Sequence, residues 1–163
     1  MNAVSALATG PGAISVLVVD DDDTTRGILT SVLTGFGFGS VLEACDGEAA
    51  ADTLRNMRVD LVICDVKMDG MNGLALVRLV RSGADAGMRH TRNVPIIMLT
   101  SYGDERVIAA CHAAGANAYI VKPLRPLRLI QRIAAVCRVE IPKLTELASK
   151  PSAIAMVGGQ FVS

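Results

Sequence analysis

The sequence has few aromatic residues and lacks apolar runs long enough to cross a membrane. Only three phenylalanines and two tyrosines occur among its 163 residues, with no tryptophan, although 51% of the residues are apolar. The core must therefore be aliphatic. No apolar run approaches the roughly 20 residues of a membrane-spanning helix. The N-terminal MNAVSALATGPGA also lacks the basic start and long apolar stretch of a secretory signal. We expect no membrane insertion and a cytoplasmic location.

The chain also lacks an excess of charge and any clustering of cysteines. Sixteen basic residues balance sixteen acidic ones, so no overall electrostatic attraction draws the protein to nucleic acid. We therefore expect no direct nucleic-acid contact. The four cysteines are scattered without C-x-x-C spacing, at Cys45, Cys64, Cys111 and Cys137. This argues against a structural metal site or a disulfide framework, and it predicts buried free thiols.

Short apolar runs alternate regularly with amphipathic stretches along the chain. The predicted strands are residues 16–19, 40–44, 60–64, 94–100 and 118–121. The predicted helices are residues 25–37, 46–57, 74–82, 104–115 and 126–139. Five βα units in succession predict an α/β fold, a doubly wound parallel sheet with helices on both faces. The second strand, SVLEA, is half-polar and is expected near an edge of the sheet.

The first strand runs directly into four aspartates, Asp20 to Asp23. Asp22 and Asp23, or Thr24 after them, are expected to cap the following helix and to favour its positive end. The apolar face of that helix is predicted to contain Ile28, Leu29, Val32 and Leu33.

Polar side chains stand at the ends of four of the five predicted strands. They are Asp20 and Asp21 after the first strand, Asp65 after the third, Thr100 at the end of the fourth and Lys122 after the fifth. In an open parallel sheet, ligands bind beyond the carboxyl ends of the strands, where the strand order reverses. Three carboxylates, a hydroxyl and an ammonium group should therefore converge on one crevice.

This set of groups suits phosphoryl transfer. Crowded carboxylates are costly unless a hard cation neutralises them, and carboxylate oxygens suit Mg²⁺. A nearby lysine provides a point charge for a phosphoryl group. Positioning and charge neutralisation supply most of the catalysis in phosphoryl transfer. A helix cap, a strand end or a solvated lysine could explain each residue singly, but those explanations do not account for the joint placement.

At these residues the chain resembles the response-regulator receiver family of two-component signalling. Its segments VLVVDD (16–21), DLVICDVKMDGMNG (60–73), IIMLTS (96–101) and GANAYIVKPL (115–124) are similar to the family's four marker segments, in order. The resemblance covers residues 15–138 and implies a flavodoxin-like receiver fold with strand order 2-1-3-4-5. The stretch GFGSVLEACDG (37–47) looks like chemotaxis-type, stand-alone receivers.

The resemblance implies that Asp65 accepts a phosphoryl group from a histidine kinase or a histidine phosphotransfer protein. Asp20 and Asp21 would hold Mg²⁺ together with the Asp65 carboxylate and the backbone carbonyl of Lys67. Such a protein is no enzyme in the ordinary sense, because it catalyses only its own phosphorylation and dephosphorylation.

The resemblance also implies how phosphorylation would be read. Thr100 would hydrogen-bond the phosphoryl group, and Lys122 would pair with it. Thr100 and Tyr119 fall at the family's switch positions, so phosphorylation would alter binding to a downstream protein target. The Lys122–Pro123 peptide is expected to be cis.

Four segments depart from the family pattern or lie outside it. Asp69 stands where the family often has proline, so the loop after Asp65 is expected to be looser. The connection 82–93 is unusually long and polar, and we expect it to be exposed and mobile at the end remote from the crevice. Around a receiver domain at 15–139, we expect a flexible N-terminal segment at 1–14 and a poorly ordered tail at 140–163. We expect no second domain within residues 140–163, so the chain is expected to be either a stand-alone regulator or a piece of a longer protein.

Two other functions fit part of the pattern. In a haloacid-dehalogenase-type phosphatase, Asp20 would be the nucleophile and Asp22 the general acid, while Thr100 and Lys122 would fill two further motifs. That family also needs an acidic pair after the lysine, and no aspartate follows Lys122. The second alternative is a degenerate receiver that binds proteins without being phosphorylated.

Overall fold

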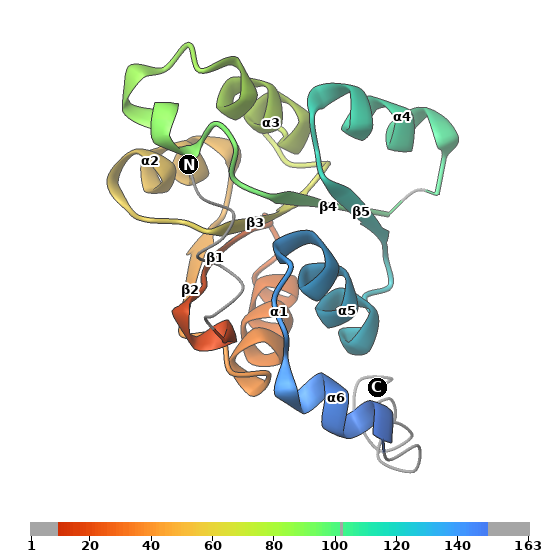
Figure 1. The fold of residues 1–163 in the computed structure, drawn as a ribbon. Helices are drawn as coiled ribbons and strands as arrows, with labels where there is room; N and C mark the ends of the chain where they lie inside the picture. The colour runs from red at the N-terminus through yellow and green to blue at the C-terminus, as the bar shows by residue number, and fades with distance from the viewer. Residues whose placement is uncertain (1–9, 102, 150–163) are drawn as a thin grey trace.

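Five parallel strands form the central sheet, and helices cover both of its faces (Figure 1). The computed structural model describes residues 10–101 and 103–149. The strands are β1 Ser15–Val19, β2 Ser40–Ala44, β3 Leu61–Asp65, β4 Ile96–Thr100 and β5 Ala118–Val121. Their order is β2-β1-β3-β4-β5, which confirms the predicted doubly wound fold. The half-polar strand β2 lies at an edge, as its composition indicated.

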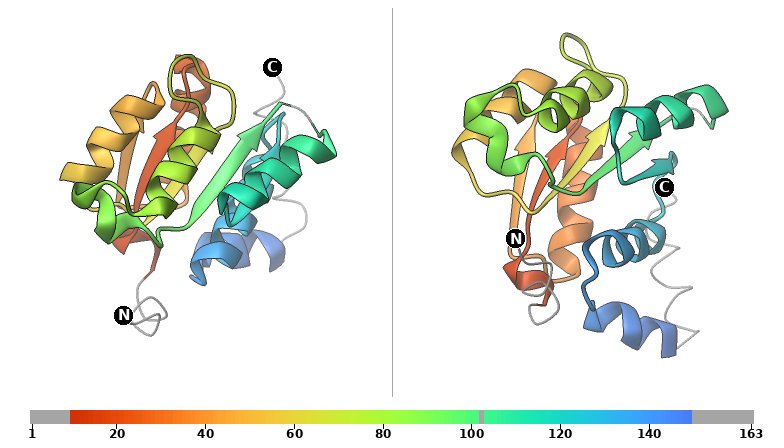
Figure 2. Two further views of the ribbon diagram at one scale, coloured as in Figure 1. Left: turned by 90° about the horizontal axis from the view of Figure 1, so that it is seen from above. Right: turned by 45° about the horizontal axis from the view of Figure 1, so that its top comes forward.

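The helices form two layers, one on each face of the sheet. They are α1 Asp23–Gly35, α2 Gly47–Asn56, α3 Gly73–Ser82, α4 Glu105–Ala114 and α5 Pro126–Cys137. Figure 2 shows α2, α3 and α4 on one side of the sheet, with α1 and α5 on the other. The bounds of the predicted helices and strands differ from these by at most two residues. In the part of the chain that the structure describes, no helix has the length and apolar character to cross a membrane.

The core consists of two aliphatic layers separated by the sheet. Successive side chains of a strand point to opposite faces. Leu17 and Val19 of β1 accordingly pack with α2, α3 and α4, whereas Val16 and Val18 pack with α1 and α5. Each residue of β3 and β4 is buried, as expected of central parallel strands covered on both faces. Burial of both faces leaves the strand ends as the place for polar chemistry.

Asp22 caps helix α1. Its carboxylate accepts hydrogen bonds from the backbone N–H groups of Thr24 (3.4 Å) and Thr25 (3.0 Å). The hydroxyl and the backbone N–H of Thr25 lower the pKa of Asp22. Asp23 is instead the first residue of the helix, and it forms an ion pair with Arg26. The prediction that Asp23 or Thr24 also serves as a cap was therefore wrong, because Asp22 has the extended backbone that a cap requires (φ −91°, ψ 113°).

Three predictions of burial need correction. Leu29, Val32 and Leu33 are buried, but Ile28 of the same helix is 41% exposed. Among the four thiols, Cys64 and Cys111 are buried, Cys137 is half-buried and Cys45 is exposed. Ile28 lies one residue before the buried stripe of α1. Cys45 follows the edge strand β2, beyond the part of the sheet that is covered on both faces.

The connection between α3 and β4 makes specific contacts with the core and with α2. It contains a short 3₁₀ helix, η3 Ala86–Thr91, whose Met88 is 1% exposed and packs into the core beside α2. The carboxylate of Asp85, just before η3, accepts a 2.8 Å hydrogen bond from Arg55 of α2. Most of the segment is exposed, as predicted, but one buried methionine and one ion pair attach it to the rest of the domain. It lies at the amino-terminal end of β4, as predicted.

Arg81 ties three segments together at this same end of the sheet. Its guanidinium donates to the carbonyl oxygens of Gly115 (2.9 Å) and Arg92 (2.7 Å) and to the side chain of Asn117 (2.8 Å). Burial lowers the pKa of Arg81. One side chain thus joins α3, the connection before β4 and the turn before β5.

The segment after α5 contains a further helix, α6 Pro142–Ser149. Ile141 is 2% exposed and packs into the layer of α1 and α5, and Lys143 donates a 2.6 Å hydrogen bond to the carbonyl of Gly35. Residues 140–149 therefore differ from the irregular tail that we expected. At the other end, η2 Pro11–Ala13 precedes β1. The expectations for residues 1–9 and 150–163 lie outside the described residues.

The anchoring of the connection can be tested by comparing Met88, inside it, with an exposed methionine elsewhere in the chain. Met88→Ala should lower the free energy of unfolding by about 2–5 kcal/mol, because it leaves a cavity in the core. Met57→Ala, at a position that is 49% exposed, should change it by no more than about 0.5 kcal/mol. Urea denaturation followed by circular dichroism measures both values. Equal effects of the two substitutions would show that Met88 does not hold the segment.

Candidate functional site

The candidate site lies at the carboxyl ends of the strands, where the sheet order reverses between β1 and β3. Oxygen atoms of Asp20, Asp21 and Asp65 all lie within 4.8 Å of one another. The Lys122 ammonium reaches them from the end of β5, with its Nζ atom 3.1 Å from Asp20 Oδ2 and 3.6 Å from Asp65 Oδ1. The structure thus brings three carboxylates and one ammonium from three different strand ends into one cluster.

Asp20 is the most deeply buried carboxylate of the cluster, with none of its surface exposed. Its Oδ1 atom accepts the backbone N–H of Asp22 at 2.9 Å, and its Oδ2 atom accepts Lys122. Its own N–H donates to the carbonyl of Ala44 in β2 at 3.2 Å. A buried charge is tolerated only when it is paired and hydrogen-bonded, and Asp20 satisfies both conditions.

Asp65, the last residue of β3, is only 7% exposed. Burial raises the pKa of its carboxyl above the ordinary value of 3.8. The Lys122 ammonium opposes this increase, while the neighbouring carboxylate of Asp20 adds to it. The ionised form of Asp65 is therefore held in an environment that favours an additional cation.

Three oxygen ligands in this arrangement fit a hard divalent cation. Mg²⁺ prefers oxygen donors and commonly uses one or two carboxylates while keeping water in other positions. Asp21 is exposed, whereas Asp20 and Asp65 are buried. The cluster is therefore open on one side, through which a hydrated ion and a phosphoryl group could enter.

Thr100 and Lys122 border the cluster from β4 and β5. Thr100 ends β4 and is 2% exposed, and its carbonyl accepts the backbone N–H of Lys122 at 2.8 Å. The Lys122–Pro123 peptide is cis, as predicted. Both residues therefore lie, like the carboxylates, at the carboxyl end of the sheet.

Lys67 and Tyr119 are the two other residues with predicted roles. The backbone N–H of Lys67 hydrogen-bonds the Asp65 carboxylate, which opposes the rise in the pKa of that group. Lys67 is exposed and lines a groove of about 610 Å³ with Asp21, Asp69 and Arg106. Tyr119 is 41% exposed on the edge strand β5. The roles inferred for Lys67 and Tyr119 remain predictions.

The loop from Val66 to Asn72 is tied down although it lacks the family's proline. The Glu48 carboxylate of α2 accepts the backbone N–H of Met71 at 3.1 Å. At the far end of the loop the N–H of Gly73 donates to the carbonyl of Val66, and a side chain at Gly73 would stand 2.1 Å from the Asp65 carbonyl. The loop is thus held at both ends. No sequence pattern indicated the role of Glu48, because Glu48 and Met71 are far apart in the chain.

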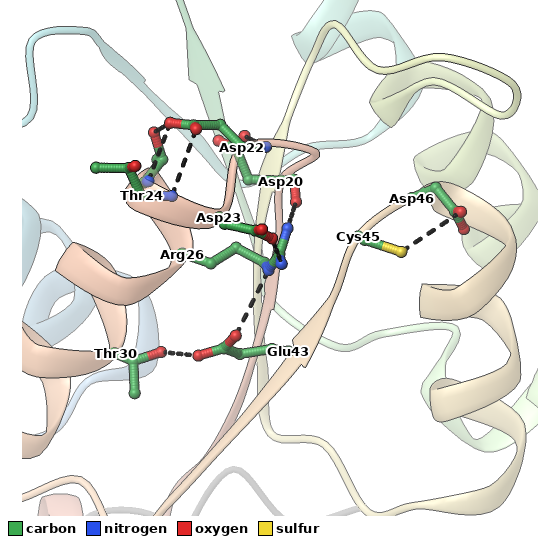
Figure 3. A network of polar contacts seen from close by, with 10 residues as sticks. Asp20, Asp22, Asp23, Thr24, Arg26, Thr30, Glu43, Cys45 and Asp46 are labelled. Carbon is green, nitrogen blue, oxygen red and sulfur yellow. Dashed lines mark hydrogen bonds and ion pairs between the residues drawn. The ribbon is translucent and has the colours of Figure 1, made fainter.

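Arg26 was also missed as a residue of the site. Its guanidinium reaches the backbone of Asp20 and two further carboxylates (Figure 3). Its spacing of three residues from Asp23 is that of a helical ion pair, and this spacing could have indicated part of the arrangement. The contact with Asp20 depends on how α1 packs against β1.

The phosphatase alternative finds little support in this geometry. It requires Asp22 as a general acid, but the carboxylate of Asp22 caps α1 and accepts the hydroxyl of Thr25 at 2.6 Å. Within residues 10–101 and 103–149, the acidic side chains that cluster around a possible metal position are Asp20, Asp21 and Asp65. They all precede Lys122, whereas that alternative needs a pair after it.

Comparison with known sequences gives one family. A model of the response regulator receiver domain matches residues 16–134. The DNA-binding response regulator MtrA of Mycobacterium tuberculosis is 38% identical over 134 residues, which cover 82% of this chain and 55% of MtrA. The chain thus spans about half the length of these regulators. A chemotaxis protein CheY homolog of Campylobacter jejuni is 40% identical over 124 residues, covering 76% of this chain and 92% of the homolog.

Solved structures show the same fold. Chemotaxis protein CheY4 of Vibrio cholerae has a TM-score of 0.68 and 31% identity, over 76% of this chain and 99% of CheY4. CheY of Borrelia burgdorferi, in a complex with CheX, BeF3 and Mg, has a TM-score of 0.68 and 31% identity, over 76% and 88% of the two chains. The segment matched by the family model includes all three clustered carboxylates and the five strands, apart from the first residue of β1. The chain therefore belongs to the response regulator receiver family.

Proposed function

We propose that the protein is a phosphoryl-accepting response regulator of a two-component phosphorelay, in which Asp65 is the acceptor. The observation that carries this assignment is the position of Asp65. It ends the central strand β3, it is buried, and it lies beside two further carboxylates and the Lys122 ammonium. A carboxylate in this position combines a reactive oxygen with the positive charge that a phosphoryl group requires.

The reaction is a transfer from a phosphohistidine of the donor protein to Asp65. A carboxylate oxygen of Asp65 forms a bond to phosphorus while the phosphorus–nitrogen bond of the phosphohistidine breaks. The electron pair of that bond stays on the nitrogen, and the imidazole leaves neutral with the proton on its other nitrogen. Attack of water on the resulting acyl phosphate releases inorganic phosphate and restores the carboxylate. The protein thereby catalyses only its own phosphorylation and dephosphorylation.

Asp20, Asp21 and Asp65 would hold Mg²⁺, joined by the backbone carbonyl of Lys67. The bound ion would neutralise charge on the transferring phosphoryl group. Two observations support this ligand set, namely the spacing of the three carboxylates and the Mg in the B. burgdorferi CheY complex. Asp20 and Lys122 already hold each other in place, which limits how far the ligands must move when the ion binds.

Lys122 and Thr100 would bind the phosphoryl oxygens after transfer. The Nζ atom of Lys122 lies 3.6 Å from Asp65 Oδ1, so it can pair with a phosphoryl group on that residue. The hydroxyl of Thr100 would donate to another phosphoryl oxygen. Together they would neutralise and orient the charge that phosphorylation adds.

The output would be a change in binding to a protein target. Thr100 and Tyr119 would act as the switch, because they link the phosphoryl site to the surface formed by α4, β5 and α5. Tyr119 and Val121 expose 41% and 38% of their surface on β5, beside the basic side chains of Arg128 and Arg132. A phosphorylation-dependent partner must bind one state of this surface more tightly than the other.

The chain is 40% identical to the C. jejuni CheY homolog and 38% identical to MtrA. We propose a chemotaxis-type receiver, because the stretch GFGSVLEACDG (37–47) looks like chemotaxis-type receivers. It would act by contact with a kinase or phosphotransfer protein and with a protein target. DNA binding is named for MtrA, and we do not extend it to this chain.

The acceptor can be identified by chemical labelling. With acetyl phosphate and Mg²⁺ present, the native protein should gain one phosphoryl group, whereas Asp65→Asn should gain none because it lacks the carboxylate nucleophile. Asp69→Asn, in the adjacent loop, should be labelled like the native protein. Intact-protein mass spectrometry gives the readout. Phosphoryl incorporation that persists in Asp65→Asn would overturn the assignment.

The metal site can be tested by comparing two neighbouring aspartates. Asp21→Ala removes a proposed ligand. It should weaken Mg²⁺ binding by at least the roughly 10–100-fold that is typical when a residue hydrogen-bonded to a metal ligand is replaced. Labelling by acetyl phosphate should also slow. Asp23→Ala removes an equal charge two residues away but no proposed ligand, so it should weaken Mg²⁺ binding by a much smaller factor than Asp21→Ala does. Isothermal titration calorimetry measures both affinities. Equal losses would refute the assignment of Asp21.

The raised pKa of Asp65 predicts how stability depends on pH in the absence of Mg²⁺. The folded protein binds this proton more tightly than the unfolded chain, whose pKa is near 3.8. Above the folded pKa the charge therefore reduces stability, and this cost disappears as the pH falls toward 3.8. Asp65→Asn should consequently melt at a higher temperature than the native protein at neutral pH. The difference should shrink as the pH is lowered, and an equal or lower melting temperature at neutral pH would contradict the argument.

A further inference from the structure

We propose that Arg26 is a positioning residue of the metal site, which holds Asp20 in place through the Asp20 backbone. The proposal rests on the Mg²⁺ site of the proposed function. It assigns a role to a residue of α1 that is itself no ligand. The argument depends on where the guanidinium lies, on what holds it there, and on how Asp20 is constrained.

Arg26 reaches back from the first turn of α1 to the end of β1. Its Nη1 atom donates a 2.7 Å hydrogen bond to the backbone carbonyl of Asp20. Only 13% of its side-chain surface is exposed, although arginine is rarely buried without partners. Figure 3 shows the guanidinium between the Asp20 backbone and two acidic side chains. An arginine in this position contacts the peptide group next to a proposed metal ligand.

Two carboxylates hold the guanidinium in this position. Asp23, on the same helical turn, pairs with Nη2, and Glu43 of the edge strand β2 lies 3.5 Å from Nε. Glu43 is itself fixed by a 2.6 Å hydrogen bond from the hydroxyl of Thr30. The Nε atom has no hydrogen-bond partner, so its contact with Glu43 is an ion pair. Burial alone would lower the pKa of Arg26, but the two carboxylates outweigh it and raise the pKa, so the cation persists.

Arg26 completes the set of contacts that fixes Asp20. The Asp20 N–H donates to Ala44, its carboxylate accepts from the backbone of Asp22 and from Lys122, and its carbonyl accepts Arg26. The peptide groups on both sides of the Asp20 Cα atom are therefore held. Because the direction of a side chain follows from its backbone, the carboxylate is aimed at the cluster before any ion binds. Groups that fix ligands in this way commonly change metal affinity by roughly 10–100-fold.

The contacts show that the four consecutive aspartates have different structural roles. Asp20 and Asp21 are the proposed ligands, Asp22 caps α1, and Asp23 anchors the arginine that holds Asp20. The charge and the position of Arg26 have opposite effects on metal binding. A guanidinium near the site repels a cation, whereas a fixed Asp20 backbone favours binding. The sign of the change in Mg²⁺ affinity on substitution therefore shows which effect dominates.

Two substitutions separate these effects. Arg26→Lys keeps the charge but loses the planar fork that reaches Asp20, and Arg26→Met removes both. If positioning dominates, the Kd for Mg²⁺ should rise by about tenfold in both variants. Arg58→Lys is the matched control, because Arg58 pairs with Asp60 on the surface and is 85% exposed. Isothermal titration calorimetry gives the Kd, and circular dichroism verifies the fold. An unchanged or lower Kd in the Arg26 variants would overturn the proposal.

A third variant covers the case in which replacing Arg26 unfolds the protein. Glu43→Gln leaves the arginine in place and removes one of the two charges that hold it. We expect the Kd for Mg²⁺ to rise in the same direction but by a smaller factor. An unchanged Kd in Glu43→Gln, with both Arg26 variants unfolded, would also overturn the proposal.

Labelling by acetyl phosphate distinguishes a positioning role from a purely structural one, because only a positioning role should change the Mg²⁺ dependence of labelling. In Arg26→Lys the Mg²⁺ concentration for half-maximal labelling should rise, while saturating Mg²⁺ should restore the native maximal rate. A lower maximal rate with unchanged Mg²⁺ dependence would reject the positioning role. Failure of the native protein to bind Mg²⁺ would reject the metal site and this inference together. Normal binding by the native protein and by all Arg26 and Glu43 variants would reject this inference alone.

Discussion

The site depends on one constraint, which is that buried carboxylates must be neutralised. Parallel strands bring Asp20 and Asp65 together at the end of the sheet, where neither can remain charged without partners. Lys122 supplies one positive charge from β5, and it must serve both carboxylates. The remaining negative charge makes the cluster receptive to a cation, so the same electrostatic imbalance that costs stability provides the chemistry.

The first helix shows how an unfavourable run of like charges is distributed in space. Asp20 points into the cluster, whereas Asp22 turns to the backbone at the start of α1 and Asp23 turns to Arg26. Neighbouring charges therefore face different cationic or N–H partners. The repulsion suggested by the sequence is reduced because Asp20, Asp22 and Asp23 each have a compensating group and Asp21 is exposed.

The fold and the membership of the cluster could be predicted because both depend on periodicity. Apolar runs marked the strands, and the residues at the strand ends marked the site. The cap at Asp22 could not be chosen over Asp23, because a shift of one residue in backbone conformation decides it. Met88 and Ile141 were missed because each is a single buried side chain in a polar segment. Contacts such as that of Arg26 with Asp20 arise only when a helix has packed against its strand.

The two ends of the sheet are built differently. At the end away from the carboxylates, Arg81 joins three segments, Met88 inserts into the core, and Lys143 bonds to the end of α1. These contacts share no residue with the cluster of Asp20, Asp21, Asp65 and Lys122. The fold is therefore secured at one end of the sheet, and the chemistry lies at the other.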